Sequence, residues 1–175
     1  MNVTTPLIIS LSLLFTLSTD LYANPNHKNL TNKDKKEIRC LAKNIYFEAR
    51  SESKRGQFAV AAVTMNRVKS KKYPNNICKV VWQRRQFSWT HDGKSDNPKD
   101  KKSWSKAQSL ATLVYKKYFK FQSISDGAWD ITRGALHYYA PRLVYPHWAK
   151  ETKKTISKTQ IGRHIFLSQR GSTNL

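Results

Sequence analysis

Carboxylates are scarce in this chain, so their positions limit the acid–base chemistry it can perform. The 175 residues carry 32 lysines and arginines against 11 aspartates and glutamates. Glu48 lies three residues after Ile45 and seven after Leu41, at the border of an apolar helical stripe. A carboxyl group partly removed from water has a raised pKa and can stay protonated as a general acid. Glu48 is therefore a candidate acid, although such residues are more often solvated or salt-bridged. Glu52, one turn later, lies on the same edge, and spacing does not rank the two.

Helices are predicted to position these groups. Periodicity predicts helices over residues 34–50, 57–68 and 77–82, with Gly56 allowing a tight turn between the first two. Ser103 can cap a further long helix, whose inner face carries Trp104, Ala107, Ala111, Val114 and Tyr118. The polar residues 83–102, between the helix over 77–82 and the helix that Ser103 caps, form a predicted loop, and loops of that length are usually functional.

Beyond Gly127 the pattern changes to short β-like runs. Residues 135–139 and 164–168 are predicted strands, separated by a connection that contains proline and lysine. Alternation along the first strand places His137 and Tyr139 on one face and Tyr138 on the other. Helices followed by a small sheet predict the α+β fold class, and the length suits a single domain.

The composition indicates a folded basic domain with an anionic partner. The formal net charge is +21, and aromatic residues make up 11% of the chain, which argues against a disordered basic tail. Charge alone does not choose between nucleic acid, a membrane surface and an acidic wall polymer. We expect no metal or cofactor, since no Cys/His spacing of a zinc site is present, and we expect a monomer.

The N-terminal segment predicts export. Residues 7–17 form an apolar run that as a helix is about 17 Å long, too short for a bilayer core of about 30 Å. We predict a signal peptide over residues 1–23, a polar leader over 24–36 and a catalytic domain over 37–170, with the mature protein in the periplasm or outside the cell. An uncleaved interfacial anchor or a buried helix is the alternative.

Two cysteines make up the whole thiol complement. In an exported protein, Cys40 and Cys78 are naturally interpreted as one disulfide, which stabilises by roughly 3–4 kcal/mol in the chain-entropy model. Two separately buried thiols are the other interpretation.

Five blocks of the chain, in order, resemble motifs of one family. They are residues 40–52 (CLAKNIYFEARSE) continuing through Gly56 and Gln57 to 60–68 (VAAVTMNRV), residues 73–81 (YPNNICKVV), residues 86–93 (QFSWTHDG), residues 134–139 (GALHYY) and residues 161–166 (IGRHIF). Together they resemble the SleB/CwlJ-type cell-wall hydrolase family, which includes the spore cortex-lytic enzymes, over about residues 36–168.

The resemblance implies a lysozyme-like transglycosylase fold and a reaction. The reaction is cleavage of the β-1,4 bond between N-acetylmuramic acid and N-acetylglucosamine, typically as a lytic transglycosylase, with Glu48 as the catalytic acid. A transglycosylase needs no second carboxylate, because the 6-hydroxyl of the substrate attacks the anomeric carbon. A hydrolytic muramidase would need a second carboxylate, for which Glu52 and then Asp92 are candidates.

The remaining site predictions concern substrate binding. The predicted contacts are Glu52, Gln86, Phe87, Ser88, His137, Tyr138, Tyr139 and Trp148. Trp89 could serve as a glycan platform or could pin its loop to the core. Where related sequences usually carry a second histidine in the GALHYY block, this chain has Tyr139. The expected partners are peptidoglycan strands and the anionic cell envelope. A nucleic-acid binder and a catalytically inactive wall- or lipopolysaccharide-binding module are the rival classes, and we expect no nucleic acid.

Overall fold

The computed structural model describes residues 29–120, 129–149 and 155–169. The predicted signal peptide, residues 1–23, lies outside these residues. No helix within the described ranges is long and apolar enough to cross a membrane.

Helix α1 (Asn32–Ala49) begins earlier than predicted. A reciprocal capping box starts it: the Asp34 backbone N–H donates to the Thr31 hydroxyl at 3.2 Å, and the Thr31 backbone N–H donates to the Asp34 carboxylate at 2.8 Å. Residues 32–36 therefore belong to the start of α1, within the segment that we predicted as a polar leader.

Helix α2 (Lys54–Lys69) also starts earlier than predicted. Gly56 is therefore helical, and the prediction of a tight turn there is wrong. Ser53 caps the helix by accepting from the Gly56 N–H at 3.2 Å, and Gly56 lies buried in the first turn. A Cβ added to Gly56 would come within 2.9 Å of the Glu52 Cβ. Close packing against Glu52, rather than chain reversal, is what requires the glycine.

Helix α3 (Ile77–Val81) matches its prediction closely, whereas α4 (Lys101–Lys120) has a different cap. Asp100 accepts from both the backbone N–H and the hydroxyl of Ser103, at 3.1 and 2.7 Å. Ser103, the predicted cap, is thus a donor inside the first turn. The inner face of α4 is as predicted, with Ala107, Ala111, Val114 and Tyr118 buried and Trp104 partly buried.

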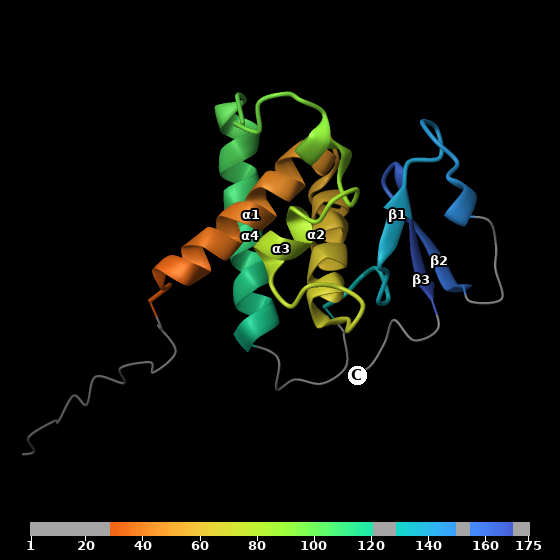
Figure 1. The fold of residues 1–175 in the computed structure, drawn as a ribbon, viewed down its shortest axis with the longest axis horizontal. Coiled ribbons are helices and arrows are strands. Elements are labelled where there is room, and N and C mark those ends of the chain that lie inside the picture. Colours follow the sequence, from red (N-terminus) through yellow and green to blue (C-terminus); the bar gives the residue numbers. More distant parts are fainter. Residues whose placement is uncertain (1–28, 121–128, 150–154, 170–175) are drawn as a thin grey trace, which may run out of the picture.

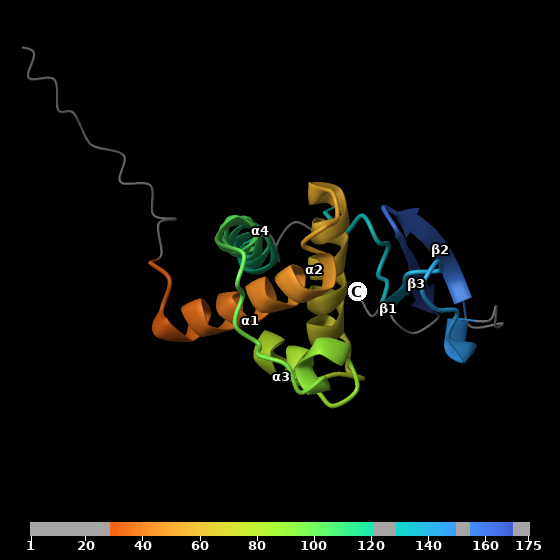
Figure 2. The ribbon, with the colours of Figure 1, turned by 90° about the horizontal axis from the view of Figure 1, so that it is seen from above.

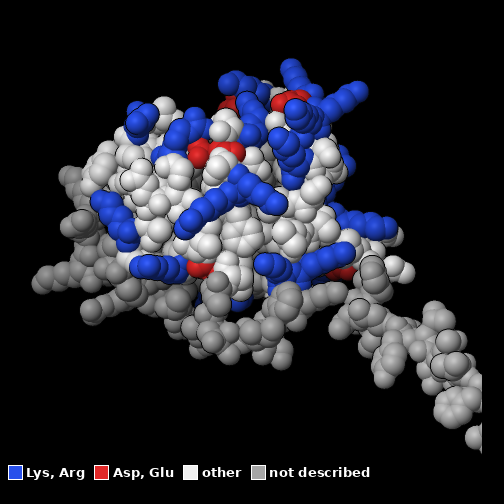
Figure 3. Space-filling view, turned by 180° about the vertical axis from the view of Figure 1, so that it is seen from behind, with Lys and Arg blue, Asp and Glu red and all other residues white. Residues whose placement is uncertain are grey.

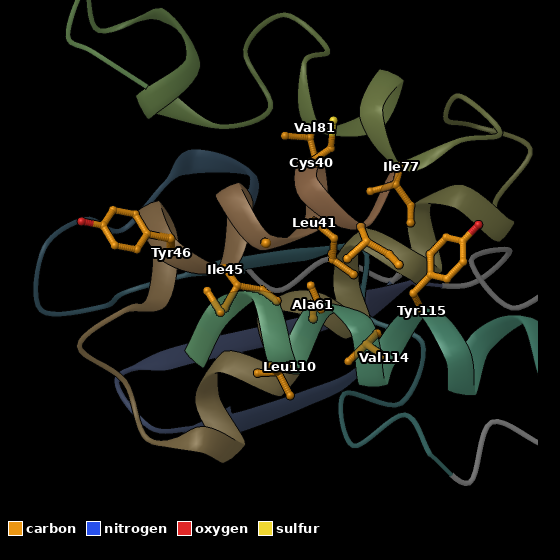
Figure 4. Packing of buried hydrophobic residues seen from close by; sticks show 14 of the residues in the cluster. Cys40, Leu41, Ile45, Tyr46, Ala61, Ile77, Val81, Leu110, Val114 and Tyr115 are labelled. Carbon is orange, nitrogen blue, oxygen red and sulfur yellow. The ribbon is translucent and has the colours of Figure 1, made fainter. Parts of the chain in front are cut away.

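The four helices enclose the larger apolar core. Leu41 and Ile45 of α1 are fully buried against Ala61, Val81 and Val114 of the other three helices (Figure 4). A disulfide joins Cys40 of α1 to Cys78 of α3, with Cα atoms 5.2 Å apart. The predicted pairing is confirmed.

Three antiparallel strands form the sheet in the order β1-β3-β2: β1 (His137–Tyr139), β2 (Thr155–Ile161) and β3 (His164–Gln169). Tyr138 pairs with Phe166, which pairs on its other side with Thr159. The α+β prediction is confirmed, but β2 falls where we expected only a connection. The lysines that precede it and Lys158 within it resemble loop composition, while Thr155, Thr159 and Ile161 carry the β-branched signal.

Helix α2 lies between the other helices and the sheet in both ribbon views (Figures 1 and 2). Ala59, Val60 and Val63 of α2 pack in one buried cluster with Ile161 and Phe166 of the sheet. This packing fixes the sheet relative to the end of α1, where Glu48 lies.

Candidate active site

A cleft of about 1140 Å³ lies where the end of α1 meets the sheet. Its lining comes from separate parts of the chain. The helical side contributes Phe47 and Glu48 of α1, Arg67 of α2, Tyr73, and the loop residues 84–89 with His91; the other wall is formed by β1, Ala140, Leu143, Val144, Pro146, Trp148 and His164. Segments far apart in sequence thus meet around one carboxyl group.

Glu48 is a half-buried acid on the last turn of α1. Its Oε2 accepts a hydrogen bond from the Tyr138 hydroxyl at 2.9 Å. Burial raises the pKa of Glu48 above its usual range, while the Tyr138 hydrogen bond and the Arg67 charge act in the opposite direction without cancelling the rise. The raised pKa favours the protonated form that a general acid needs.

Tyr138, predicted as a substrate contact, directs its hydroxyl group to the carboxylate of Glu48. Burial and the neighbouring Glu48 charge raise the pKa of Tyr138 well above its ordinary value, so the phenol stays a donor. Its ring packs edge-on against His164, with centroids 5.4 Å apart, and lies 5.5 Å from the Phe166 ring. The sheet therefore holds the hydroxyl that orients the acid.

Glu52 does not join Glu48, although both lie on one edge of the sequence pattern. Its side chain is only 3% exposed and forms an ion pair with Arg163, whose backbone N–H also donates to it at 3.3 Å. Burial alone would raise the pKa of Glu52, but the hydrogen bonds and charge of Arg163 lower it. Glu52 braces the β2–β3 turn at Gly162 and does not line the cleft.

Asp92 also lies away from the cleft lining. It is exposed, and its carboxylate accepts from the Lys94 backbone N–H at 2.9 Å. Among the residues that the structure describes, Glu48 is thus the sole carboxylate lining the cleft. The arrangement offers one acid and no described second carboxylate on which a hydrolytic mechanism could rely.

The predicted loop residues Gln86, Phe87 and Ser88 do line the cleft. Phe87 is only 3% exposed, so little of its ring surface is available for stacking on a sugar. Trp89 is buried, stacks on Phe47 with centroids 4.6 Å apart and donates from Nε1 to Asn44 at 3.3 Å. These contacts indicate that Trp89 anchors its loop to the helical core rather than serving as a glycan platform.

The opposite wall brings together His137, Tyr139 and Trp148, as predicted for one strand face and the following loop. Trp148 lies 5.4 Å from the His137 ring and 5.9 Å from the Tyr139 ring, and it is 46% exposed. Burial, then the charges of Arg67 and Lys72, lower the pKa of His137 to about 4, so the imidazole is neutral at pH 7.

Sequence reasoning did not single out Arg67 or His164. Arg67 is 5% exposed and donates from Nε to the Leu136 carbonyl at 2.9 Å. An arginine that follows the run of small apolar residues 59–63 in a largely buried helix was the available signal, since buried arginines are rare and need partners. No cluster of three potential metal ligands occurs among the described residues.

A half-buried acid with a raised pKa that lines a cleft is typical of an enzyme active site. The chain belongs to the Cell Wall Hydrolase family, whose model matches residues 51–167. That match begins three residues beyond Glu48.

Relatives and solved structures agree with this membership. The spore cortex-lytic enzymes of Bacillus cereus and Oceanobacillus iheyensis are 33% and 31% identical to this chain, over 133 and 132 residues. Each alignment covers 74% of this chain but only 43% and 41% of those relatives. The chain therefore spans less than half of their length.

The solved structures correspond to catalytic domains. The catalytic domain of the germination-specific lytic transglycosylase SleB from Bacillus anthracis has a TM-score of 0.55 at 31% identity, and that of Bacillus cereus SleB has 0.58 at 27%. Each comparison covers 82% of this chain and 99% of the solved domain. The family resemblance and the fold predicted from the sequence are confirmed.

Proposed function

We propose that this chain is an exported peptidoglycan-degrading enzyme that cleaves the β-1,4 bond between N-acetylmuramic acid and N-acetylglucosamine. It acts as a lytic transglycosylase that leaves 1,6-anhydro-N-acetylmuramic acid ends. The observation that carries the proposal is Glu48: a carboxyl group with a raised pKa, hydrogen-bonded to Tyr138, and the sole carboxylate lining the cleft among the described residues.

In the first step, protonated Glu48 gives its proton to the glycosidic oxygen, and the bond from that oxygen to the anomeric carbon breaks. The Tyr138 hydroxyl donates to Oε2, so it stabilises the carboxylate that forms. In the second step, the carboxylate takes the proton of the 6-hydroxyl as that oxygen bonds to the oxocarbenium-like carbon. Glu48 is protonated again, and no water is consumed.

The absence of a second carboxylate from the described lining supports a lyase over a hydrolase. Hydrolytic glycosidases hold a second carboxyl group about 5 to 9.5 Å from the acid, as nucleophile or base. Glu52 is paired with Arg163 in an ion pair, and Asp92 is exposed to solvent outside the cleft lining. An intramolecular hydroxyl needs neither residue, since the substrate supplies the nucleophile.

Substrate contacts come from both walls of the cleft. Gln86 and Ser88 offer polar groups on the loop side, and Trp148 offers a partly exposed ring on the sheet side. The Tyr139 hydroxyl is buried and has no hydrogen-bond partner among the described residues, which leaves it free to bond a sugar hydroxyl. His137, neutral at pH 7, can donate or accept.

The basic surface supports binding to an anionic envelope. Lysines and arginines are spread across the face shown in Figure 3 and far outnumber acidic residues there. Removal of residues 1–23 would take away one charged residue, Asp20, and so raise the net positive charge by one. Activity on whole cell walls should fall as ionic strength rises, because salt screens this attraction.

The test compares Glu48→Gln with Asp92→Asn on purified murein. Both variants remove one carboxylate, and Asp92 is exposed outside the cleft lining. The proposal expects Asp92→Asn to release anhydro-muropeptides as the wild type does and Glu48→Gln to release almost none. Undiminished clearing by Glu48→Gln would leave the inactive binding module, or chemistry elsewhere, as the explanation.

A further inference from the structure

Arg67 is a buried cation that forms no ion pair with any of the described residues. It lies in the last turn of α2 and is 5% exposed. In the described part of the chain, no carboxylate lies within ion-pair distance of its guanidinium group. Buried charges in proteins are normally paired, because leaving one uncompensated is strongly destabilising. An unpaired arginine beside a cleft therefore points to a ligand that completes the pair.

The guanidinium group is held in place before any ligand arrives. Nε donates to the Leu136 carbonyl at 2.9 Å, and the group lies over two aromatic rings, 5.3 Å from Tyr73 and 5.1 Å from Phe87. Nη1 is buried and has no hydrogen-bond partner among the described residues. Arg67 thus lines the cleft as a fixed cation with an unused donor.

The surroundings of Arg67 favour an anion. Arg84 and Arg85 also line the cleft, and Glu48 is the sole acidic residue in the described lining. Arg67 is near enough to Glu48 for its charge to lower the pKa of that residue, though burial has the larger, opposite effect. While Glu48 is protonated and ready to act as an acid, the described lining carries no negative charge.

We propose that Arg67 binds a carboxylate carried by the glycan strand beside the scissile bond, so that the enzyme selects muramyl strands with free carboxylates over neutral strands. This inference rests on the proposed function. A carboxylate accepts two parallel N–H bonds from a guanidinium group, a geometry that lysine does not reproduce. The muramyl residue offers two sources: its own lactyl carboxylate when no peptide is attached, or a carboxylate of an attached stem peptide.

The first experiment uses the wild-type protein and changes only the substrate. Peptide-free strands with free lactyl carboxylates, the same strands with these groups converted to neutral methylamides, and peptide-bearing strands are digested at low and high salt. We expect the carboxylate-bearing strands to show a KM roughly ten- to a hundredfold lower than the neutral strands. The preference should persist at high salt, because a buried cation is weakly screened.

The substrate arms separate the two sources. A preference for peptide-free strands assigns the lactyl carboxylate, and a preference for peptide-bearing strands assigns the stem peptide. Equal kcat/KM on all three kinds of strand would overturn the inference, and so would a preference that disappears with salt. A wild-type enzyme that releases no anhydro ends from any strand would instead overturn the proposed function.

The second experiment locates the preference in Arg67. In Arg67→Gln the ratio of kcat/KM on carboxylate-bearing strands to kcat/KM on neutral strands should fall to about one, and Arg67→Lys should recover only part of the wild-type ratio. Arg39→Gln, on the exposed face of α1, removes the same charge outside the cleft and should keep the full preference. An Arg67→Gln protein that folds, as judged by thermal unfolding, and keeps the full preference would contradict the assignment.

Discussion

The helical part and the sheet part of the molecule are held together in different ways. Residues 29–120 build a dense core from four helices, and a disulfide ties α1 to α3. The sheet part relies on packing against α2 and on a small cluster formed by Tyr139, Ala149 and Leu167. The helical part therefore fixes the acid, while the sheet part supplies the hydroxyl and the rings that surround it.

The same contrast appears within one stretch of chain, between Glu48 and Glu52. One carboxyl group meets a tyrosine hydroxyl in a cleft, and its pKa is raised. The other meets the Arg163 guanidinium under a turn, and its pKa is lowered. Four residues of separation thus give a candidate acid and a structural brace, because the sheet presents a different partner to each.

The largest effect should follow Glu48→Gln. Loss of a general acid typically costs about 10²- to 10⁴-fold in rate, so anhydro-muropeptide release should fall by that factor. The folded-state pKa of Glu48 is raised, so its contribution to stability is present below the unfolded-state pKa and is lost as pH rises through the folded-state value. The variant should therefore be more stable than the wild type at neutral pH and similar at acid pH, in thermal unfolding. Equal pH profiles of stability for the two proteins would contradict the buried setting of Glu48.

The next largest effect should come from removing the disulfide. Cys40 and Cys78 are 38 residues apart, and the chain-entropy model gives about 3–4 kcal/mol for a loop of that size. A Cys40→Ala/Cys78→Ala protein should lose about that much free energy of unfolding in a urea titration. The loss should equal that of the wild type under reducing conditions. An unchanged urea midpoint would show that the helical core does not need this link.

Tyr138→Phe should have a smaller effect on rate and a diagnostic effect on pH dependence. The hydroxyl stabilises the charged form of Glu48, so its removal should raise the pKa of Glu48 further. We expect about a tenfold lower kcat, the equivalent of one hydrogen bond to a charged group, and an alkaline limb of kcat shifted to higher pH. A shift to lower pH would contradict this role, as would an effect on KM alone.

The smallest effect should follow Glu52→Gln. Arg163 is 58% exposed, so water screens the pair and the expected loss is about 1 kcal/mol of unfolding free energy. The folded-state pKa of Glu52 is lowered, so its stabilisation is present above the unfolded-state pKa and is lost as pH falls through the folded-state value. The difference from wild type should hence vanish in acid, as for Glu48→Gln, but at neutral pH it should have the opposite sign, because Glu52→Gln is the less stable protein there. Cleavage of murein well below the unfolding temperature should be retained; its loss would return Glu52 to the catalytic site.

The sequence was informative where one local signal decides the structure. Helical periodicity located the inner faces of α1 and α4, and the scarcity of carboxylates together with the family motifs selected Glu48. It was less informative about caps. Helices α1 and α4 start after Thr31 and Asp100 rather than at the expected residues, because side-chain hydrogen bonds, not periodicity, determine where a helix starts.

Tertiary contacts could not be predicted in this way. Nothing local to Glu52 reveals that Arg163, 111 residues later, folds over it. The same holds for the Tyr138 hydroxyl, which reaches Glu48 across 90 residues of sequence. Strand β2 was missed because the lysines before it and the exposed Lys158 within it resemble a loop, and only pairing with β3 makes it a strand.

The mass of the product tests the central chemistry most directly. Murein digested with the wild-type protein is separated and weighed by mass spectrometry, without a reduction step that would alter the ends. A single acid assisted by the substrate's own hydroxyl predicts muropeptides lighter by one water than muramidase products. Products with the mass of muramidase products, and with ¹⁸O incorporated from labelled solvent, would contradict the account and require a second catalytic group.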